Sequence, residues 1–139
     1  MRIHPEPFRP VENRRIFVVE DDEIIRSALQ FILDDRNEAH AFRSLDLAFA
    51  KAANVRPDVV LLGIGFLQSD GKRRLAEIAC RLSDAKILIV ADSLRDPLAL
   101  RSLDEGAHGV LGKPITFDSV HGKVNTVLDE SSLSLVSLG

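Results

Sequence analysis

The chain has 139 residues, a formal net charge of −3 and one cysteine, and a chain of this length fits a single domain with a sizeable core. Its 45% apolar and 28% charged residues are typical of a soluble globular protein, and we expect it in the cytoplasm. The single cysteine excludes an internal disulfide and a cysteine-based zinc site. The small negative net charge does not predict binding to nucleic acid. No apolar run has the character of a signal peptide or the length of a membrane span.

The chain begins with three prolines among mixed charges, which predict an extended lead-in over residues 1–14. The folded domain is expected over residues 15–129. Residues 130–139 are rich in serine and leucine and lack turn signals, so we expect them to form a short, loose tail.

The segment Ile16–Glu23 joins an apolar strand to a cluster of carboxylates. Ile16–Val19 is an unbroken apolar run, as in a strand that is buried on both faces of a parallel sheet. Four acidic residues, Glu20–Glu23, follow at the carboxyl end of this strand, where ligands bind in open α/β sheets. Clustered carboxylates repel one another, and hard cations such as Mg²⁺ take oxygen ligands. The segment predicts either a metal or phosphate-handling site or acids that only cap the next helix.

Apolar residues at spacings of three and four predict a helix over residues 22–35, followed by Asn37 in a left-handed conformation. Ala39–Phe42 is predicted to be a short edge strand. Ser44 is expected to cap a second helix that runs to about Ala53.

Asp58–Leu62 predicts another buried strand, and Gln68–Gly71 has the composition of a turn. An amphipathic helix follows, and Cys80 is expected to be buried beside its apolar positions. The outer face of this helix is basic, which most often marks solvated surface. The basic residues are Lys72, Arg73, Arg74 and Arg81.

Ile87–Val90 predicts a third buried strand, and Asp96-Pro97 is a favourable start for a helix that ends at Gly106. Gly109–Leu111 is expected to be the last strand. Thr116 is expected to cap a final helix that carries Val120, Val124, Val127 and Leu128.

Strands and helices therefore alternate in five units, which predicts a parallel sheet with helices on both faces. The fold class is α/β, a three-layer α/β/α sandwich with five parallel strands in the flavodoxin-like order 2-1-3-4-5. Neighbouring parallel strands end at one edge of such a sheet. The acids after the first strand, Gly63 after the third and Lys113-Pro114 after the fifth are expected to meet there.

On these motifs, residues 15–128 resemble the receiver (CheY-like) domain of bacterial response regulators. In that family two acids after the first strand hold Mg²⁺, and Glu20 and Asp21 match them. An aspartate at the end of the third strand accepts the phosphoryl group. A threonine or serine ends the fourth strand, and an aromatic residue precedes Lys-Pro in the fifth, where the lysine pairs with the acceptor. The resemblance implies a signalling module, and we expect no enzyme, since the sequence has no positioned nucleophile–base pair.

The chain departs from this pattern at three positions. Gly63 stands at the acceptor position and has no carboxylate nucleophile. Ala91 replaces the hydroxyl residue, and Val110 replaces the aromatic ring that changes position in the family. We expect a degenerate receiver that does not run the phosphorylation switch and acts as a protein-interaction module.

The loss of the acceptor also removes a metal ligand. Glu20, Asp21 and the carbonyl of Gly65 remain as candidate ligands, so Mg²⁺ binding is expected to be weak or lost. We expect no other cofactor. Lys113 is expected to pair with Glu20 or Asp21 in a structural role.

Two alternatives stay open from the sequence. In the first, the chain is a true phosphorelay receiver with an unconventional acceptor among Ser69, Asp70, Asp92 and Ser93. In the second, it binds a small anion that fills the space left by Gly63 and Ala91 and is attracted by Lys113. The four histidines have no shared spacing that suggests a metal site or a catalytic triad; they are His4, His40, His108 and His121.

The resemblance also implies partners. Residues 22–35 correspond to the helix that contacts histidine kinases or phosphotransfer proteins in the family, and residues 97–128 to the face that forms homodimers or contacts output proteins. We expect protein partners of these kinds and neither nucleic acid nor membrane as a partner.

Overall fold

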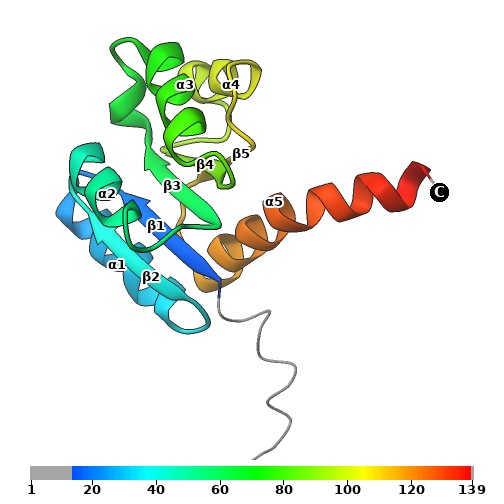
Figure 1. Cartoon of the computed structure of the whole chain (residues 1–139), viewed down its shortest axis with the longest axis horizontal. Helices are drawn as coiled ribbons and strands as arrows, with labels where there is room; N and C mark the ends of the chain where they lie inside the picture. Colours follow the sequence, from blue (N-terminus) through cyan, green and yellow to red (C-terminus); the bar gives the residue numbers. More distant parts are fainter. Residues whose placement is uncertain (1–13, 139) are drawn as a thin grey trace, which may run out of the picture.

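The computed structural model describes residues 14–138, with side chains described as far as Asp129. The predicted lead-in lies outside these residues except for Arg14. Strands and helices alternate along the chain (Figure 1). The elements are β1 (Arg15–Val19), α1 (Glu23–Asp34), β2 (Glu38–Phe42), α2 (Leu45–Ala52), β3 (Val59–Gly63), the short 3-10 helix η2 (Ile64–Leu67), α3 (Gly71–Arg81), β4 (Lys86–Ala91), α4 (Pro97–Asp104), β5 (Gly109–Gly112) and α5 (Phe117–Leu138).

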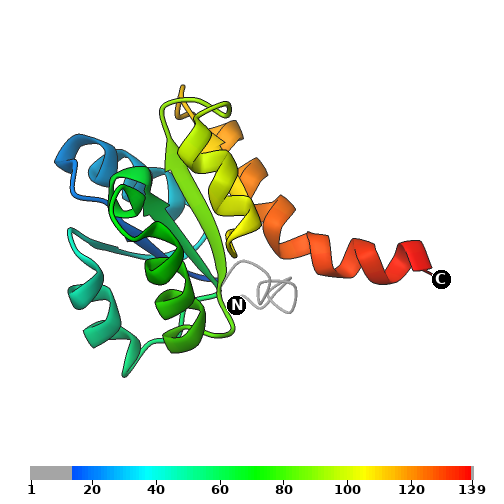
Figure 2. The ribbon, with the colours of Figure 1, turned by 90° about the horizontal axis from the view of Figure 1, so that it is seen from above.

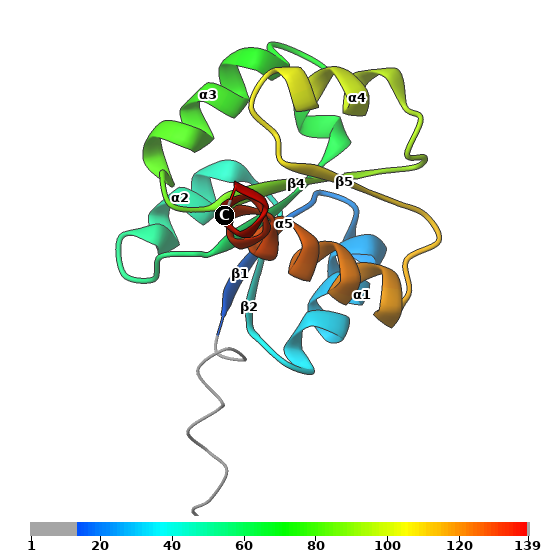
Figure 3. The same ribbon diagram turned by 90° about the vertical axis from the view of Figure 1, so that its right-hand side faces the viewer.

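The five strands form one parallel sheet in the order β2-β1-β3-β4-β5. Seen along the sheet, α1 and α5 cover one face and α2, α3 and α4 cover the other (Figure 3). This confirms the predicted three-layer α/β/α sandwich. From β1 the chain first adds β2 on one side and then β3, β4 and β5 on the other. β1 and β3 therefore lie at the switch point where ligands bind in folds of this type.

Each central strand contributes to two separate cores because successive side chains point to opposite faces of a sheet. In β1, Ile16 and Val18 pack under α1 and α5, whereas Phe17 and Val19 pack under α2 and α3. All four side chains are fully buried. This explains why the strand is an unbroken apolar run rather than an alternating one.

The predicted helix starts are confirmed by their hydrogen bonds. The side chain of Asp22 accepts from the N–H groups of Ile24 and Ile25, and Asp96 caps α4 in the same way ahead of Pro97. Thr116 and Ser119 exchange hydrogen bonds from backbone N–H to side-chain oxygen, at 3.0 Å each, where α5 begins. Such caps satisfy N–H groups that have no partner inside the helix.

Asn37 is not left-handed, contrary to the prediction, since Asp70 is the one non-glycine residue with positive φ among those described. The N–H of Asn37 still reaches the carbonyl of Leu33 at 3.0 Å, and its side-chain amide donates to the same carbonyl. The residue therefore extends the last turn of α1 instead of reversing the chain.

The final helix is longer than the sequence suggested. α5 continues to Leu138, and its last turns point away from the sheet (Figures 1 and 2). The backbone of residues 130–138 is therefore helical and not a loose tail. No glycine or proline interrupts residues 123–138, so nothing stops the hydrogen-bond ladder from propagating. The domain boundaries themselves stay a prediction.

Cys80 is exposed, and the prediction that it is buried is wrong. The inner face of α3 is formed by Leu75 and Ile78, with Leu82 just after the helix, at spacings of three and four. Cys80 is two residues beyond Ile78, which places it about 200° around the helix and on the outside.

Candidate functional site

The predicted strand ends do meet at the carboxyl edge of the sheet. β1 ends just before Glu20, β3 ends at Gly63 and β4 ends at Ala91. A hollow of about 210 Å³ opens at this edge. It is lined by Glu20, Asp21, Asp22, Ile25, Ile64, Gly65, Val90, Ala91, Asp92 and Lys113.

Glu20 occupies the space beside Gly63. A Cβ atom built on Gly63 would lie 2.5 Å from Oε1 of Glu20 and 2.9 Å from its Cδ. The carboxylate of Glu20 thus fills the position into which a side chain at residue 63 would extend. Its other oxygen accepts a hydrogen bond from the N–H of Asp22 at 2.9 Å, which holds the side chain in this orientation.

Burial raises the pKa of Glu20 above its usual range, and the nearby charges of Asp21 and Asp22 act in the same direction. The hydrogen bond from the N–H of Asp22 opposes this shift because it favours the charged form. The backbone of Glu20 is also held in place, because its carbonyl accepts a hydrogen bond from Nη1 of Arg26 at 2.8 Å. This contact has no signal in the sequence, since an arginine at this place on α1 is part of no recognisable motif.

Lys113 does not pair with Glu20 or Asp21, contrary to the prediction. Its Nζ lies 3.0 Å from Oδ1 of Asp92, which raises the pKa of Lys113. The sheet explains this choice, because Ala91 and Gly112 are partners in register and the next residues of β4 and β5 are Asp92 and Lys113. β1 is separated from β5 by β3 and β4. The Lys113-Pro114 peptide bond is cis.

Ala91 and Val110 are both buried in the core on the α2–α3–α4 side of the sheet. Ala91 also lines the hollow, where its methyl group offers no hydrogen-bond donor. Val110 does not line it.

The residues present do not form a ready metal site. Among the described residues no group of three His, Cys, Asp or Glu side chains is arranged to hold a metal ion. Glu20 is turned toward Gly63, and the carbonyl of Gly65 already accepts from the N–H of Gln68 at 3.4 Å. Asp21 is exposed at the rim of the hollow.

Of the substitute acceptors, only Asp92 lines the hollow. Asp70 precedes α3 and lies 3.8 Å from Arg73, while the carbonyl of Ser69 accepts from Nε of Arg74. The hydroxyl of Ser93 accepts from the N–H of Arg95. The three residues outside the hollow therefore serve the geometry of their loops.

The histidines within the described part of the chain have separate structural partners. His40 lies 2.7 Å from Glu38, His108 accepts from the N–H of Ile87, and Nε2 of His121 lies 3.1 Å from the carbonyl of Ile32. His4 lies outside the described residues.

Comparison with known proteins gives a consistent answer. Residues 16–125 match the model of the response regulator receiver domain. The chain is 31% identical over 116 residues to the transcriptional regulatory protein LnrK of Bacillus subtilis, which covers 81% of this chain and 53% of LnrK. It is 27% identical over 109 residues to the chemotaxis protein CheY of Listeria monocytogenes, covering 76% of this chain and 91% of CheY. A response regulator structure from Thermotoga maritima superposes with a TM-score of 0.74 at 19% identity, covering 84% of this chain and 98% of that one.

The fold and these matches place the chain in one class: it belongs to the response regulator receiver domain family, the signalling modules of two-component systems. Receiver domains interact with kinases and output domains, generally are not enzymes, and commonly bind Mg²⁺ at the phosphorylation site. The chain spans about half the length of LnrK and of several other curated relatives. None of the helices, within the residues described, has the length and apolar character to cross a membrane.

Proposed function

We propose that this chain is a phosphorylation-independent receiver that signals through protein contacts. One observation carries the proposal: residue 63 is a glycine, and the carboxylate of Glu20 fills the space beside it. Without a side chain at this position there is no oxygen to form an acyl phosphate. The other two parts of the switch are missing as well, since Ala91 has no hydroxyl and Val110 is a small side chain fixed in the core.

Mg²⁺ binding is proposed to be weak. The candidate ligands are Glu20, Asp21 and the Gly65 carbonyl, and two of these three already accept hydrogen bonds from the protein backbone. A bound Mg²⁺ would have to draw Glu20 away from Gly63. Because Mg²⁺ needs near-ideal octahedral geometry, such rearrangement lowers its affinity.

The first helix supports a role in protein binding. Ile24 and Phe31 of α1 are 80% and 72% exposed, and Phe31 packs edge-to-face on Phe117, itself 44% exposed. Exposed apolar side chains grouped on one face are typical of interaction sites. We assign this face to a histidine kinase, phosphotransfer protein or output protein in the cytoplasm. Residues 97–128, where Leu100 and Leu103 are also exposed, are the proposed homodimer contact.

Binding of a small anion at the carboxyl edge is less well supported. The hollow is lined by four carboxylates against the one ammonium group of Lys113, and Lys113 is already paired with Asp92. The electrostatic environment therefore favours cations.

A retained phosphorelay activity has one observation in its favour, because Asp92 is a carboxylate inside the hollow and beside Lys113. With acetyl phosphate as the phosphoryl donor, an oxygen of Asp92 would form the new bond to phosphorus. The bond between phosphorus and the acetyl oxygen would break, and acetate would leave. The ion pair with Lys113 occupies one of these oxygens, which lowers the reactivity of the carboxylate.

Treatment with acetyl phosphate followed by intact-mass measurement separates the two functions. We expect no phosphoryl addition to the wild-type chain at neutral pH with Mg²⁺. Gly63→Asp, which returns a carboxylate to the acceptor position, serves as the positive control. Stable addition to the wild type that disappears in Asp92→Asn would instead establish the unconventional acceptor and refute the proposed function.

A further inference from the structure

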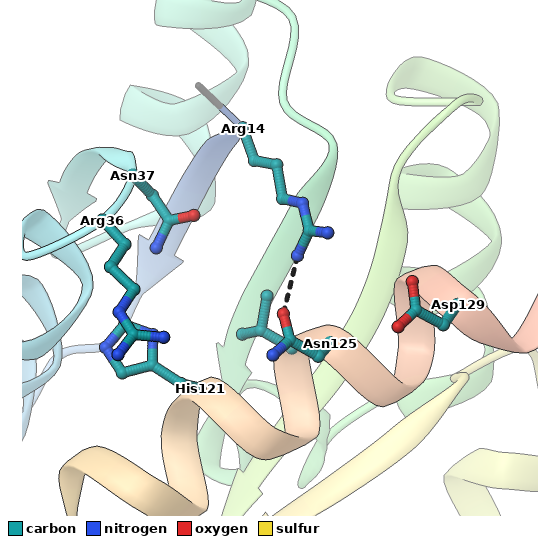
Figure 4. Close-up of a pocket in the computed structure, with 7 residues that line it drawn as sticks. Arg14, Arg36, Asn37, His121, Asn125 and Asp129 are labelled. Carbon is teal, nitrogen blue, oxygen red and sulfur yellow. Dashed lines mark hydrogen bonds between the residues drawn. The ribbon is translucent and has the colours of Figure 1, made fainter. Parts of the chain in front are cut away.

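A second hollow lies far from the carboxyl edge, where β1 begins and α1 ends (Figure 4). It has a volume of about 250 Å³. Its polar lining comes from three parts of the fold that are distant in sequence: the residue before β1, the turn after α1, and α5. These residues are Arg14, Arg36, Asn37, His121, Asn125 and Asp129.

Two guanidinium groups border this hollow from different elements. Arg14 donates from Nη1 to Oδ1 of Asn125 at 2.7 Å, which orients its planar group over α5. A guanidinium has five N–H donors, and this contact uses one of them. Arg36 is paired only loosely within the described residues, with its Nε 3.6 Å from Oδ2 of Asp35 and both side chains more than half exposed. Counting contacts with the described residues, both arginines therefore retain N–H donors for a ligand.

The backbone around the hollow does not cancel this positive charge. The carbonyls at the end of α1 are the negative end of the helix dipole. Two of them have partners here: the Leu33 carbonyl accepts from the N–H groups of Arg36 and Asn37 and from the side-chain amide of Asn37. The Ile32 carbonyl is in contact with Nε2 of His121.

Two carboxylates act against an anion, and their positions limit where it can sit. Asp35 lies beside Arg36, and more than half of its side chain is exposed. In the view of Figure 4, Asp129 lies on the other side of the Arg14–Asn125 hydrogen bond from Arg36 and His121. The most positive part of the hollow is thus the space between Arg14, Arg36 and Asn37.

We propose that this space binds a small oxyanion of the phosphate class, held between Arg14 and Arg36. Planar guanidinium groups match the oxygens of phosphate in paired hydrogen bonds. Asn37 and Asn125 supply neutral polar groups to the lining, and the buried Val124 supplies an apolar one. The volume is below that of most sites for drug-sized ligands, so the anion is free phosphate or a small phosphate ester. The site is separate from the carboxyl edge and does not depend on the proposed function.

The test is a titration of the ¹⁵N-labelled chain with inorganic phosphate, at constant ionic strength against chloride, followed by NMR. We expect saturable shifts in the side-chain signals of Arg14, Arg36, Asn37 and Asn125, with no matching shifts at Glu20–Glu23. Arg36→Gln should weaken binding by at least about tenfold, because it removes charge-assisted hydrogen bonds from an exposed side chain without disturbing the core.

Arg73→Gln is the matched control. Arg73 is an exposed arginine on α3, on the opposite face of the sheet, and its loss should leave phosphate binding unchanged. Acetate at the same ionic strength tests the preference for phosphate over a planar carboxylate. The proposal is refuted if phosphate causes no saturable shift, if Arg36→Gln binds as well as the wild type, if Arg73→Gln weakens binding equally, or if acetate binds as tightly as phosphate.

Discussion

A single glycine determines the chemistry of the carboxyl edge in two ways. Gly63 provides no carboxylate, and it leaves room for the carboxylate of Glu20. The backbone of Gly63 has φ −62° and ψ 139°, a conformation that any residue adopts. The absence of a side chain, and not a need for glycine flexibility, is therefore what distinguishes this position.

Gly63→Asp is expected to displace Glu20 and to add a third anionic candidate ligand beside Glu20 and Asp21. Because the new charge lies beside a buried carboxylate, the variant should lose about 1–2 kcal/mol of unfolding free energy without metal. Millimolar Mg²⁺ should restore much of this loss, since three anionic ligands hold the cation better than two. Chemical denaturation with and without Mg²⁺ measures both effects.

Gly63→Ala is the matched control for this experiment, since it displaces Glu20 without adding charge. We expect its stability to be within about 1 kcal/mol of the wild type and insensitive to Mg²⁺. A Mg²⁺ response as large in Gly63→Ala as in Gly63→Asp would show that the added carboxylate is not the cause.

The edge residue Glu38 gives a prediction about pH. A hydrogen bond from His40, together with one from Arg15, lowers the pKa of Glu38. A carboxyl group with a lowered folded-state pKa stabilises the fold above its unfolded pKa, and this contribution disappears as the pH falls through the folded value. Glu38→Gln should therefore melt slightly lower than the wild type at pH 7, and the two melting curves should converge in acid. A constant difference between pH 7 and pH 3 would contradict this.

At the scale of elements, side chains at the helix starts determine where the chain changes direction. Asp22, Ser44 and Asp96 each accept hydrogen bonds from the first N–H groups of a helix. Asp22 belongs to the acidic cluster, and it caps the next helix, which was one of the two predictions for this cluster. Glu20 and Asp21 do not cap α1.

Asp96→Ala should destabilise the chain by about 1 kcal/mol, because the N–H groups of Leu98 and Ala99 lose their acceptor at the start of α4. Thermal unfolding followed by circular dichroism measures the loss. Asp104→Ala, at the other end of the same helix, removes a negative charge from the negative end of the dipole and should be neutral or slightly stabilising. Equal losses in both variants would argue against a capping effect.

For the molecule as a whole, we propose that stability comes from the two cores on either side of the sheet and does not depend on a bound metal. Both cores are continuous apolar clusters, and the described residues include no three-ligand metal cluster. The charges at the carboxyl edge are partly offset within the protein, by the N–H of Asp22 on Glu20 and by Lys113 on Asp92.

We therefore expect the melting temperature of the wild-type chain to change by less than about 2 °C on addition of millimolar Mg²⁺. Differential scanning fluorimetry with Mg²⁺, and with the same concentration of a monovalent salt as control, provides the measurement. A large rise specific to Mg²⁺ would mean that Glu20 leaves Gly63 to bind the metal, and the proposal of a weak site would then be wrong.

The sequence by itself determined the fold class, the order of elements and the absence of a carboxylate at residue 63. These properties depend on local patterns: apolar runs for buried strands, spacings of three and four for helices, and capping residues beside them. The outward position of Cys80 also follows from the helical period, but the prediction of burial followed the usual state of a free cysteine.

Only the tertiary structure decided which charged groups meet. Lys113 pairs with Asp92 because β4 and β5 are neighbours in register, and Glu20 turns inward because the space at Gly63, on a different strand, is empty. The basic hollow likewise combines Arg14, Arg36 and α5, which are far apart in sequence. Such contacts depend on the relative position of separate elements, and a local pattern has no information about that position.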